Sequence, residues 1–140
     1  LGGLVGITAG ADLMLPGSSI AIGIISGPIV FLSSSLLENA ELDDPVGAIP
    51  VHLFCGIWGT LAVGIFGSMA SFDQFMIQLA CVGITGVFCI VAGTIIVQLV
   101  KAVKGLRVSE DAEEVGFDIS EHDGSLAYAQ FQITSKKYHK

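Results

Sequence analysis

One histidine lies alone among apolar and small residues. His52 follows Pro45 by seven residues, and no Asp, Glu, Lys, Arg or other histidine lies between Val46 and Ala70. At 1.5 Å per residue, it would lie roughly 10 Å along a helix that begins at Pro45. Its neutral imidazole could donate one hydrogen bond and accept another. Two interpretations stay open: a ligand or proton relay at a functional site, and a histidine bonded to a nearby backbone carbonyl.

The residues one turn on either side of His52 are small. Ala48 and Gly56 leave room for a second helix or a narrow lumen beside the ring. The spacing predicts that Ala48, His52, Gly56 and Gly59 lie on one helical face, because residues three and four apart share a face. Pro50 removes one backbone donor from the same stretch. This face is the candidate packing surface of the helix that carries the histidine.

The start of that helix has a recognisable sequence. Asp44 precedes Pro45. A carboxylate can accept bonds from free N–H groups at a helix start, and proline at the first helical position loses no bond. The sequence therefore predicts Asp44 as the cap and Pro45 as the first residue of the helix.

The composition places these residues in a membrane rather than in water. Hydrophobic residues make up 52% of the 140 residues and charged residues 14%, against roughly 25% charged in an average soluble domain. All six Lys and Arg lie at or beyond Lys101. The chain begins in apolar sequence at Leu1, so we expect it to be part of a longer protein. Three cysteines (Cys55, Cys81 and Cys89) lack metal-ligand spacing and are expected to be buried free thiols.

Apolar stretches of about 20 residues predict membrane-spanning helices. The predicted spans are about 18–37, 46–70 and 75–100, preceded by a partial helix over 1–11, and residues 101–140 form a polar tail. The fold class is thus an all-α polytopic transmembrane helix bundle. The basic residues Lys101, Lys104 and Arg107 follow the last span, which places the C-terminus in the cytoplasm by the positive-inside rule. The net charge of −7 argues against nucleic acid as a partner.

Several segments resemble one family. Residues 43–52, 55–60 and 64–66 are similar to the tenth helix of bacterial-type members of the ammonium transporter family (Amt/Mep/Rh), and residues 3–10 are similar to the end of the eighth. Residues 105–110, 116–122 and 127–128 are similar to the family's cytoplasmic tail. Leu53 departs from the pattern, since the family usually has glycine there. The resemblance implies the C-terminal part of an eleven-helix fold with an inverted repeat.

The family's activity follows from the resemblance as an expectation. It implies transport of ammonium or ammonia through a hydrophobic pore in a multi-pass protein of the cell membrane, without enzymatic activity and without a cofactor or metal. His52 matches the second of the family's twin pore histidines, and the first would lie upstream of Leu1. The implied partners are the lipid bilayer, two further copies in a homotrimer, and a PII-type signalling protein at the cytoplasmic face. An alternative is an Amt-like ammonium sensor that signals through its tail.

The same resemblance assigns a regulatory role to the tail. Its matching positions are Gly116, Asp118, Ser120 and Tyr128. Ser120 matches a position that can be phosphorylated in some plant members of the family. A phosphate beside Asp118 would add like charge and could undock the tail.

Overall fold

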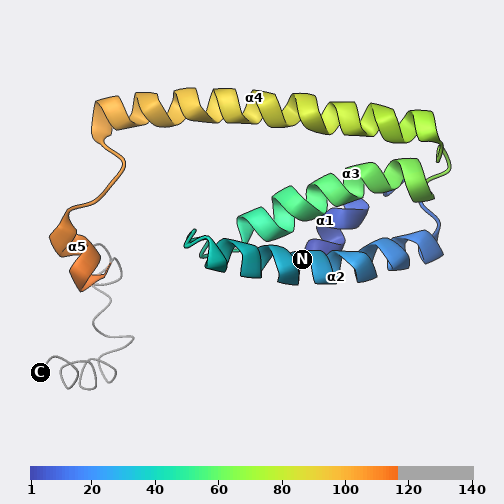
Figure 1. Cartoon of the computed structure of the whole chain (residues 1–140), viewed down its shortest axis with the longest axis horizontal. Helices are drawn as coiled ribbons and strands as arrows, with labels where there is room; N and C mark the ends of the chain where they lie inside the picture. The colour runs from blue at the N-terminus through green and yellow to red at the C-terminus, as the bar shows by residue number, and fades with distance from the viewer. Residues whose placement is uncertain (117–140) are drawn as a thin grey trace, which may run out of the picture. The chain divides into compact units, whose positions relative to one another are not determined.

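The computed structural model describes residues 1–116, and every regular element within them is helical (Figure 1). This confirms the predicted all-α fold. In chain order the elements are α1 (Gly2–Thr8), α2 (Pro16–Asn39), the π-helical segment η1 (Ile49–Phe54), α3 (Cys55–Phe66), α4 (Phe72–Lys104) and α5 (Glu110–Val115). Three continuous helical segments are long and apolar enough to cross a membrane: Pro16–Asn39, Ile49–Phe66 and Phe72–Lys104.

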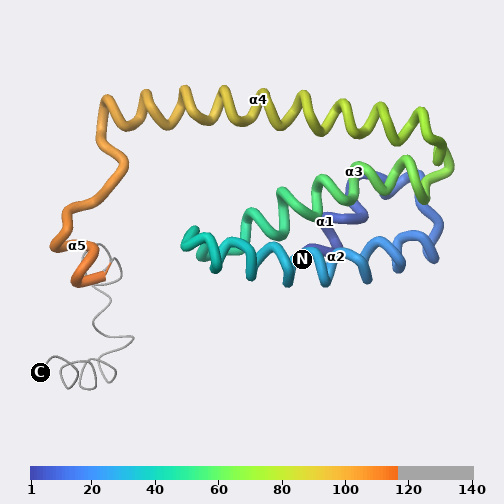
Figure 2. The backbone as a smooth tube through the Cα atoms, in the orientation of Figure 1, coloured from blue at the N-terminus to red at the C-terminus, as the bar shows by residue number. Residues whose placement is uncertain are grey.

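The described chain divides into two units, residues 1–90 and the part after Ile90, of which residues 91–116 are described. Within the first, α1 packs against both α2 and α3, which also contact each other (Figure 2). Glycines allow this close approach. A Cβ atom added to Gly59 would collide with the backbone carbonyl of Gly6, and one added to Gly6 would collide with the Ser26 hydroxyl. Lipid gives helices no hydrophobic reason to associate, so such close packing of small residues is a main source of stability in a membrane bundle.

Polar contacts between α2 and α3 reinforce this packing. The carbonyl of Ile22 accepts from the indole Nε1 of Trp58 at 3.2 Å and from the Ser26 hydroxyl at 2.8 Å. One turn further on, the Cys55 thiol lies 3.7 Å from the carbonyl oxygen of Ser26. Ile22, Ser26 and Cys55 have no exposed surface. The two helices are therefore joined by polar side chains of α3 that find hydrogen-bond partners on the backbone of α2.

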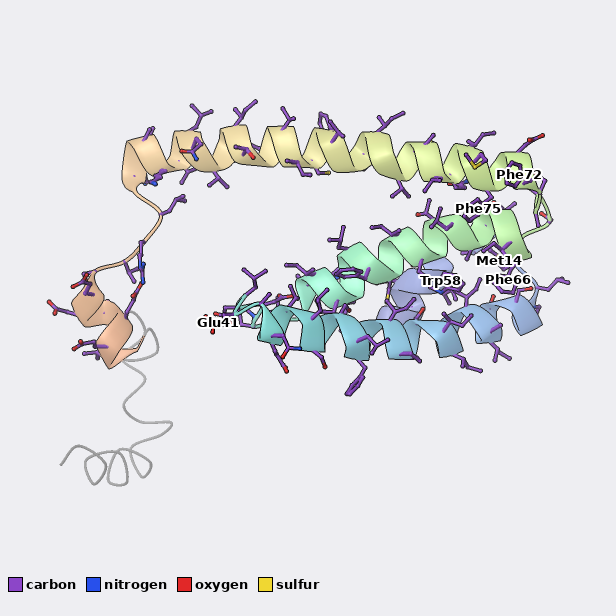
Figure 3. The ribbon with its side chains drawn as sticks, viewed as in Figure 1. Met14, Glu41, Trp58, Phe66, Phe72 and Phe75 are labelled. Carbon is purple, nitrogen blue, oxygen red and sulfur yellow. The ribbon has the colours of Figure 1, made fainter. Side chains whose placement is uncertain are left out.

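The helix that carries His52 is shorter at both ends than the predicted span of 46–70. Its first helical residue is Ala48, and it ends at Phe66 because Gly67 adopts an extended backbone. The next N–H, of Ser68, donates to the carbonyl of Leu13 at 3.0 Å. The turn is thus tied to the loop before α2. Side chains of both segments, including Met14 and Phe66, are visible there in Figure 3.

The last long helix exceeds its predicted range of 75–100. It begins at Phe72, where the Ser71 hydroxyl accepts from the N–H of Gln74 at 3.1 Å. It continues through Lys104, so the first four residues of the predicted tail, 101–104, are helical. The first residue that stops it is Gly105, whose φ of 76° is left-handed and favours glycine.

Exposure differs sharply between these helices. α4 has no buried residue, whereas 39% of the segment Ile49–Phe66 is buried. Large apolar side chains such as Phe88, Ile90 and Ile96 are more than half exposed on α4. Such a surface suits contact with lipid or with further helices rather than with water.

The second unit contains the end of α4 and the short helix α5. Ser109 caps α5, its hydroxyl accepting from the N–H of Ala112 at 3.3 Å. Arg107 donates from Nε and an Nη to the two carboxylate oxygens of Glu113 at 2.7 and 2.9 Å. This bidentate pair links the segment before α5 to the helix itself, a six-residue element that the sequence did not predict.

Candidate functional site

His52 lines a groove between its own helix and the first half of α4. The groove has a volume of about 280 Å³. Its lining is largely apolar, with polar atoms from His52 and from a few small side chains. The lining residues are His52, Leu53, Gly56, Ile57, Thr60, Cys81, Val82, Thr85, Gly86 and Cys89.

The imidazole of His52 is free to act on a small molecule in this groove. The residue is exposed, and among residues 1–116 no hydrogen bond reaches its ring. The sequence left two interpretations open for His52. The second of them, a hydrogen bond from the ring to a nearby backbone carbonyl, is not present among the described residues. A neutral imidazole has one donor and one acceptor nitrogen. In an apolar groove it can bind a small polar molecule that accepts from one ring nitrogen or donates to the other.

Asp44 holds the start of the histidine helix, although not in the predicted way. Its two carboxylate oxygens accept from the N–H groups of Ala48 at 2.9 Å and Ile49 at 2.8 Å. Pro45 is not the first helical residue: it lies in a turn that is closed by the N–H of Gly47 donating to the Asp44 carbonyl at 3.1 Å. Gly47 has a φ of 66°, a left-handed conformation that favours glycine. This residue delays the helix by three positions.

The predicted single packing face is split in two. Gly59 is buried against Gly6 of α1, whereas Gly56 lines the groove and a Cβ added there would meet no atom within 4 Å. Ala48 is exposed at the start of the helix. The prediction assumed α-helical spacing throughout, but the π-helical segment places an extra residue within one turn. The π-helical segment ends at Phe54, so it shifts His52 relative to α3. Gly56 and Gly59 both lie in α3, about 60° apart around the helix axis, and this difference lets Gly56 line the groove while Gly59 packs on α1.

Several groove residues were missed in the sequence. Thr60 lies two turns beyond His52, with its hydroxyl donating to the carbonyl of Gly56 at 2.9 Å. Cys81, Thr85 and Cys89 come from α4 and recur every four residues, which was the available signal for a common face. The prediction that all three cysteines are buried was wrong for Cys81 and Cys89. Both are exposed, like the rest of α4, which has no buried residue.

Only one of the predicted tail residues lies within the described part of the chain. Gly116 follows α5 with a φ of 91°. Asp118, Ser120 and Tyr128 lie outside the described residues. Within residues 1–116, no group of three His, Cys, Asp or Glu side chains could hold a metal ion.

The sequence model of one protein family, described as the Ammonium Transporter Family, matches residues 1–128. The chain belongs to this family. The match covers the groove, the Asp44 turn and all three long helices, and it confirms the resemblance described above. Together with the three apolar helices, it makes the chain part of a multi-pass membrane protein. The family is named for transport rather than for a chemical reaction, in agreement with the prediction that the chain is not an enzyme.

Individual relatives carry the same name. The protein sll1017 of Synechocystis sp., named as a candidate ammonium transporter, is 40% identical over 122 residues, which cover 87% of this chain and 27% of that protein. Ammonium transporter Amt2 of Archaeoglobus fulgidus is 36% identical over 149 residues, covering 94% of this chain and 32% of the relative. Amt2 of Methanocaldococcus jannaschii is 39% identical over 125 residues, which cover 86% of this chain and 30% of that relative. The chain therefore spans roughly a third or less of the length of these relatives.

Proposed function

We propose that the protein to which this chain belongs moves ammonium or ammonia across the cell membrane, with His52 at the path of the transported species. The observation that carries the proposal is an unbonded imidazole in an apolar groove, within a chain of the Ammonium Transporter Family. The helix Ile49–Phe66 contains no other histidine and no Asp, Glu, Lys or Arg. An ionisable group within an apolar span is costly to desolvate, and such residues commonly mark the path of a substrate or ion.

The chemistry of the groove favours the neutral molecule. An ammonium ion would lose its hydration in an apolar path and gain no counter-charge, whereas ammonia is small, neutral and able to donate and accept hydrogen bonds. The imidazole can accept a hydrogen bond from ammonia at its unprotonated nitrogen or donate one to ammonia from its protonated nitrogen. We propose that a second histidine, upstream of Leu1, completes the site, so that the pair can share one proton.

The wider assembly belongs to the same proposal. Three basic residues (Lys101, Lys104 and Arg107) follow the last apolar stretch, which favours a cytoplasmic C-terminus. The proposed whole protein is an eleven-helix homotrimer in the cell membrane with a regulatory tail over residues 101–140, where a PII-type protein could bind. Gly116, Asp118, Ser120 and Tyr128 are the proposed regulatory positions of the tail.

Uptake of labelled methylammonium by cells that express the full-length protein tests the proposal. The change His52→Ala should reduce uptake on the order of tenfold or more, equivalent to about 1.4 kcal/mol of lost stabilisation along the path. The matched control is Ile65→Ala, which removes an exposed side chain of the same helix outside the groove. Undiminished uptake by a well-expressed His52→Ala protein would exclude the proposed role of the histidine.

A further inference from the structure

The turn that carries His52 is a π-helical segment with an unusual distribution of buried residues. Pro50 and Cys55 are both fully buried, and they are five residues apart. In an α-helix, residues five apart point about 140° away from each other. The i→i+5 bonds of a π-helix bring such residues close to one face. The π-helical turn thus allows both side chains to pack inward.

His52 lies between these two buried residues and is exposed to the groove. An extra residue in one turn changes the helical register by about 100° relative to an uninterrupted α-helix. If this turn were α-helical and Cys55 stayed buried against Ser26, Pro50 would face outward. The residues around Pro50, including His52, would be rotated with it. The orientation of His52 therefore depends on keeping the wide turn.

The backbone donors at the start of this segment are all accounted for. The N–H groups of Ala48 and Ile49 donate to the Asp44 carboxylate. Pro50 has no N–H, and the N–H of Val51 donates to the carbonyl of Gly47 at 3.1 Å. The first four N–H groups of a helix normally need partners from outside it. Asp44 supplies both of the partners that come from a side chain.

We infer that Asp44 is a positioning residue for His52: its two charge-assisted bonds fix the start of the π-helical turn, and this turn directs the imidazole into the groove. Hydrogen bonds to a carboxylate are about twice as strong as neutral ones, so a single residue can fix the register. Beyond the segment, α3 is held independently by Gly59 against Gly6 and by Trp58 on Ile22. Loss of the Asp44 bonds should rotate His52 and leave α3 in place. The importance of this rotation for transport rests on the proposed function, but the orientation itself does not.

A pair of thiol reporters tests the inference in the full-length protein with its reactive cysteines, Cys81 and Cys89 included, replaced by serine. One protein carries His52→Cys and another carries Ile57→Cys, on the same groove but within α3. Asp44→Ala should change the rate at which a methanethiosulfonate probe modifies Cys at position 52 by roughly tenfold, because thiol reactivity follows exposure. The rate at position 57 should stay unchanged. Asp44→Asn, which keeps one acceptor oxygen, should give an intermediate rate at position 52.

Two results would overturn the inference: an unchanged rate at position 52, or equal changes at both positions, which would make Asp44 a general structural residue. If Asp44→Ala fails to fold, Asp44→Asn provides the same comparison. Pro50→Ala is a second variant, because it restores a donor that permits an α-helical turn, and it should also alter position 52 alone. Uptake by His52→Ala separates the two proposals. Undiminished uptake together with a shifted reporter would exclude the transport role of His52 and leave the positioning role of Asp44 intact.

Discussion

At the scale of single residues, glycines set the distance between helices. Gly59 faces the backbone of Gly6, so α1 and α3 touch with no side chain between them. Gly17, in contrast, lies at the start of α2, and a Cβ added there would meet no atom within 4 Å. The two positions make a matched pair.

Gly59→Ala should lower the stability of the full-length protein by on the order of 1–3 kcal/mol, since the added methyl group overpacks a backbone contact that cannot yield easily. Gly17→Ala should be neutral or slightly stabilising, because alanine is the better helix former. Thermal unfolding in detergent measures both. Equal midpoints for the two variants would argue against the close contact of α1 with α3.

Residue types predicted the candidate site only in part. His52 stood out because no other histidine or charged side chain lies in its span, and Asp44 because a carboxylate before a proline is a good cap. The groove residues Cys81 and Thr85 could not be assigned, because they belong to another helix and only the tertiary arrangement brings them to His52. The single face of Ala48, His52, Gly56 and Gly59 assumed α-helical spacing, and the π-helical turn at Ile49–Phe54, which has no simple sequence signal, changes the spacing of Ala48 and His52 relative to the two glycines.

At the scale of elements, the existence of the three spans was predictable and their ends were not. Apolar length identifies a span. The ends depend on local groups: Gly67 in an extended backbone ends α3, and Gly105 in a left-handed one ends α4. The helix α5 begins at a Ser109 cap and is linked to the segment before it by a bidentate ion pair, and composition reveals neither feature.

The ion pair of α5 makes a prediction about pH. Hydrogen bonding to the Arg107 guanidinium lowers the pKa of the Glu113 carboxyl below its ordinary value of 4.5. Because the pKa is lowered in the folded state, the pair contributes order to α5 above the ordinary pKa. That contribution is lost as the pH falls through the lowered value. Arg107→Gln should raise the pKa of Glu113 towards the ordinary value.

A carboxyl ¹³C NMR titration of the full-length protein measures this pKa. Arg107→Lys is the matched control, because it keeps the positive charge and loses the planar bidentate geometry. It should give an intermediate pKa. High salt should weaken the effect, since both groups are exposed to solvent. An unchanged pKa in Arg107→Gln would show that the pair does not persist in solution.

At the scale of the whole molecule, the order of spans and loops determines which loops share a side of the membrane. Two membrane crossings separate the segment after α4 from the loop between α2 and η1. One crossing separates that segment from the loop between α3 and α4. With a cytoplasmic tail, the loop that contains Glu41 should lie inside and the loop that contains Ser68 outside.

Cysteine labelling in intact cells tests this topology, in a full-length background without other reactive thiols. Both Glu41 and Ser68 are exposed, so Glu41→Cys and Ser68→Cys form a matched pair. A membrane-impermeant maleimide should label Ser68→Cys directly and Glu41→Cys only after the cells are made permeable. The reverse pattern would place the tail outside and contradict the proposed site for a cytoplasmic partner.

The length of α4 has a consequence for the surrounding lipid. Its 33 residues extend about 50 Å at 1.5 Å per residue, and the apolar part from Phe75 to Val100 alone extends about 39 Å by the same measure. A typical hydrocarbon layer is only about 30 Å thick. This hydrophobic mismatch requires the helix to tilt or the bilayer to thicken around it. The protein is therefore expected to respond to the acyl-chain length of its membrane.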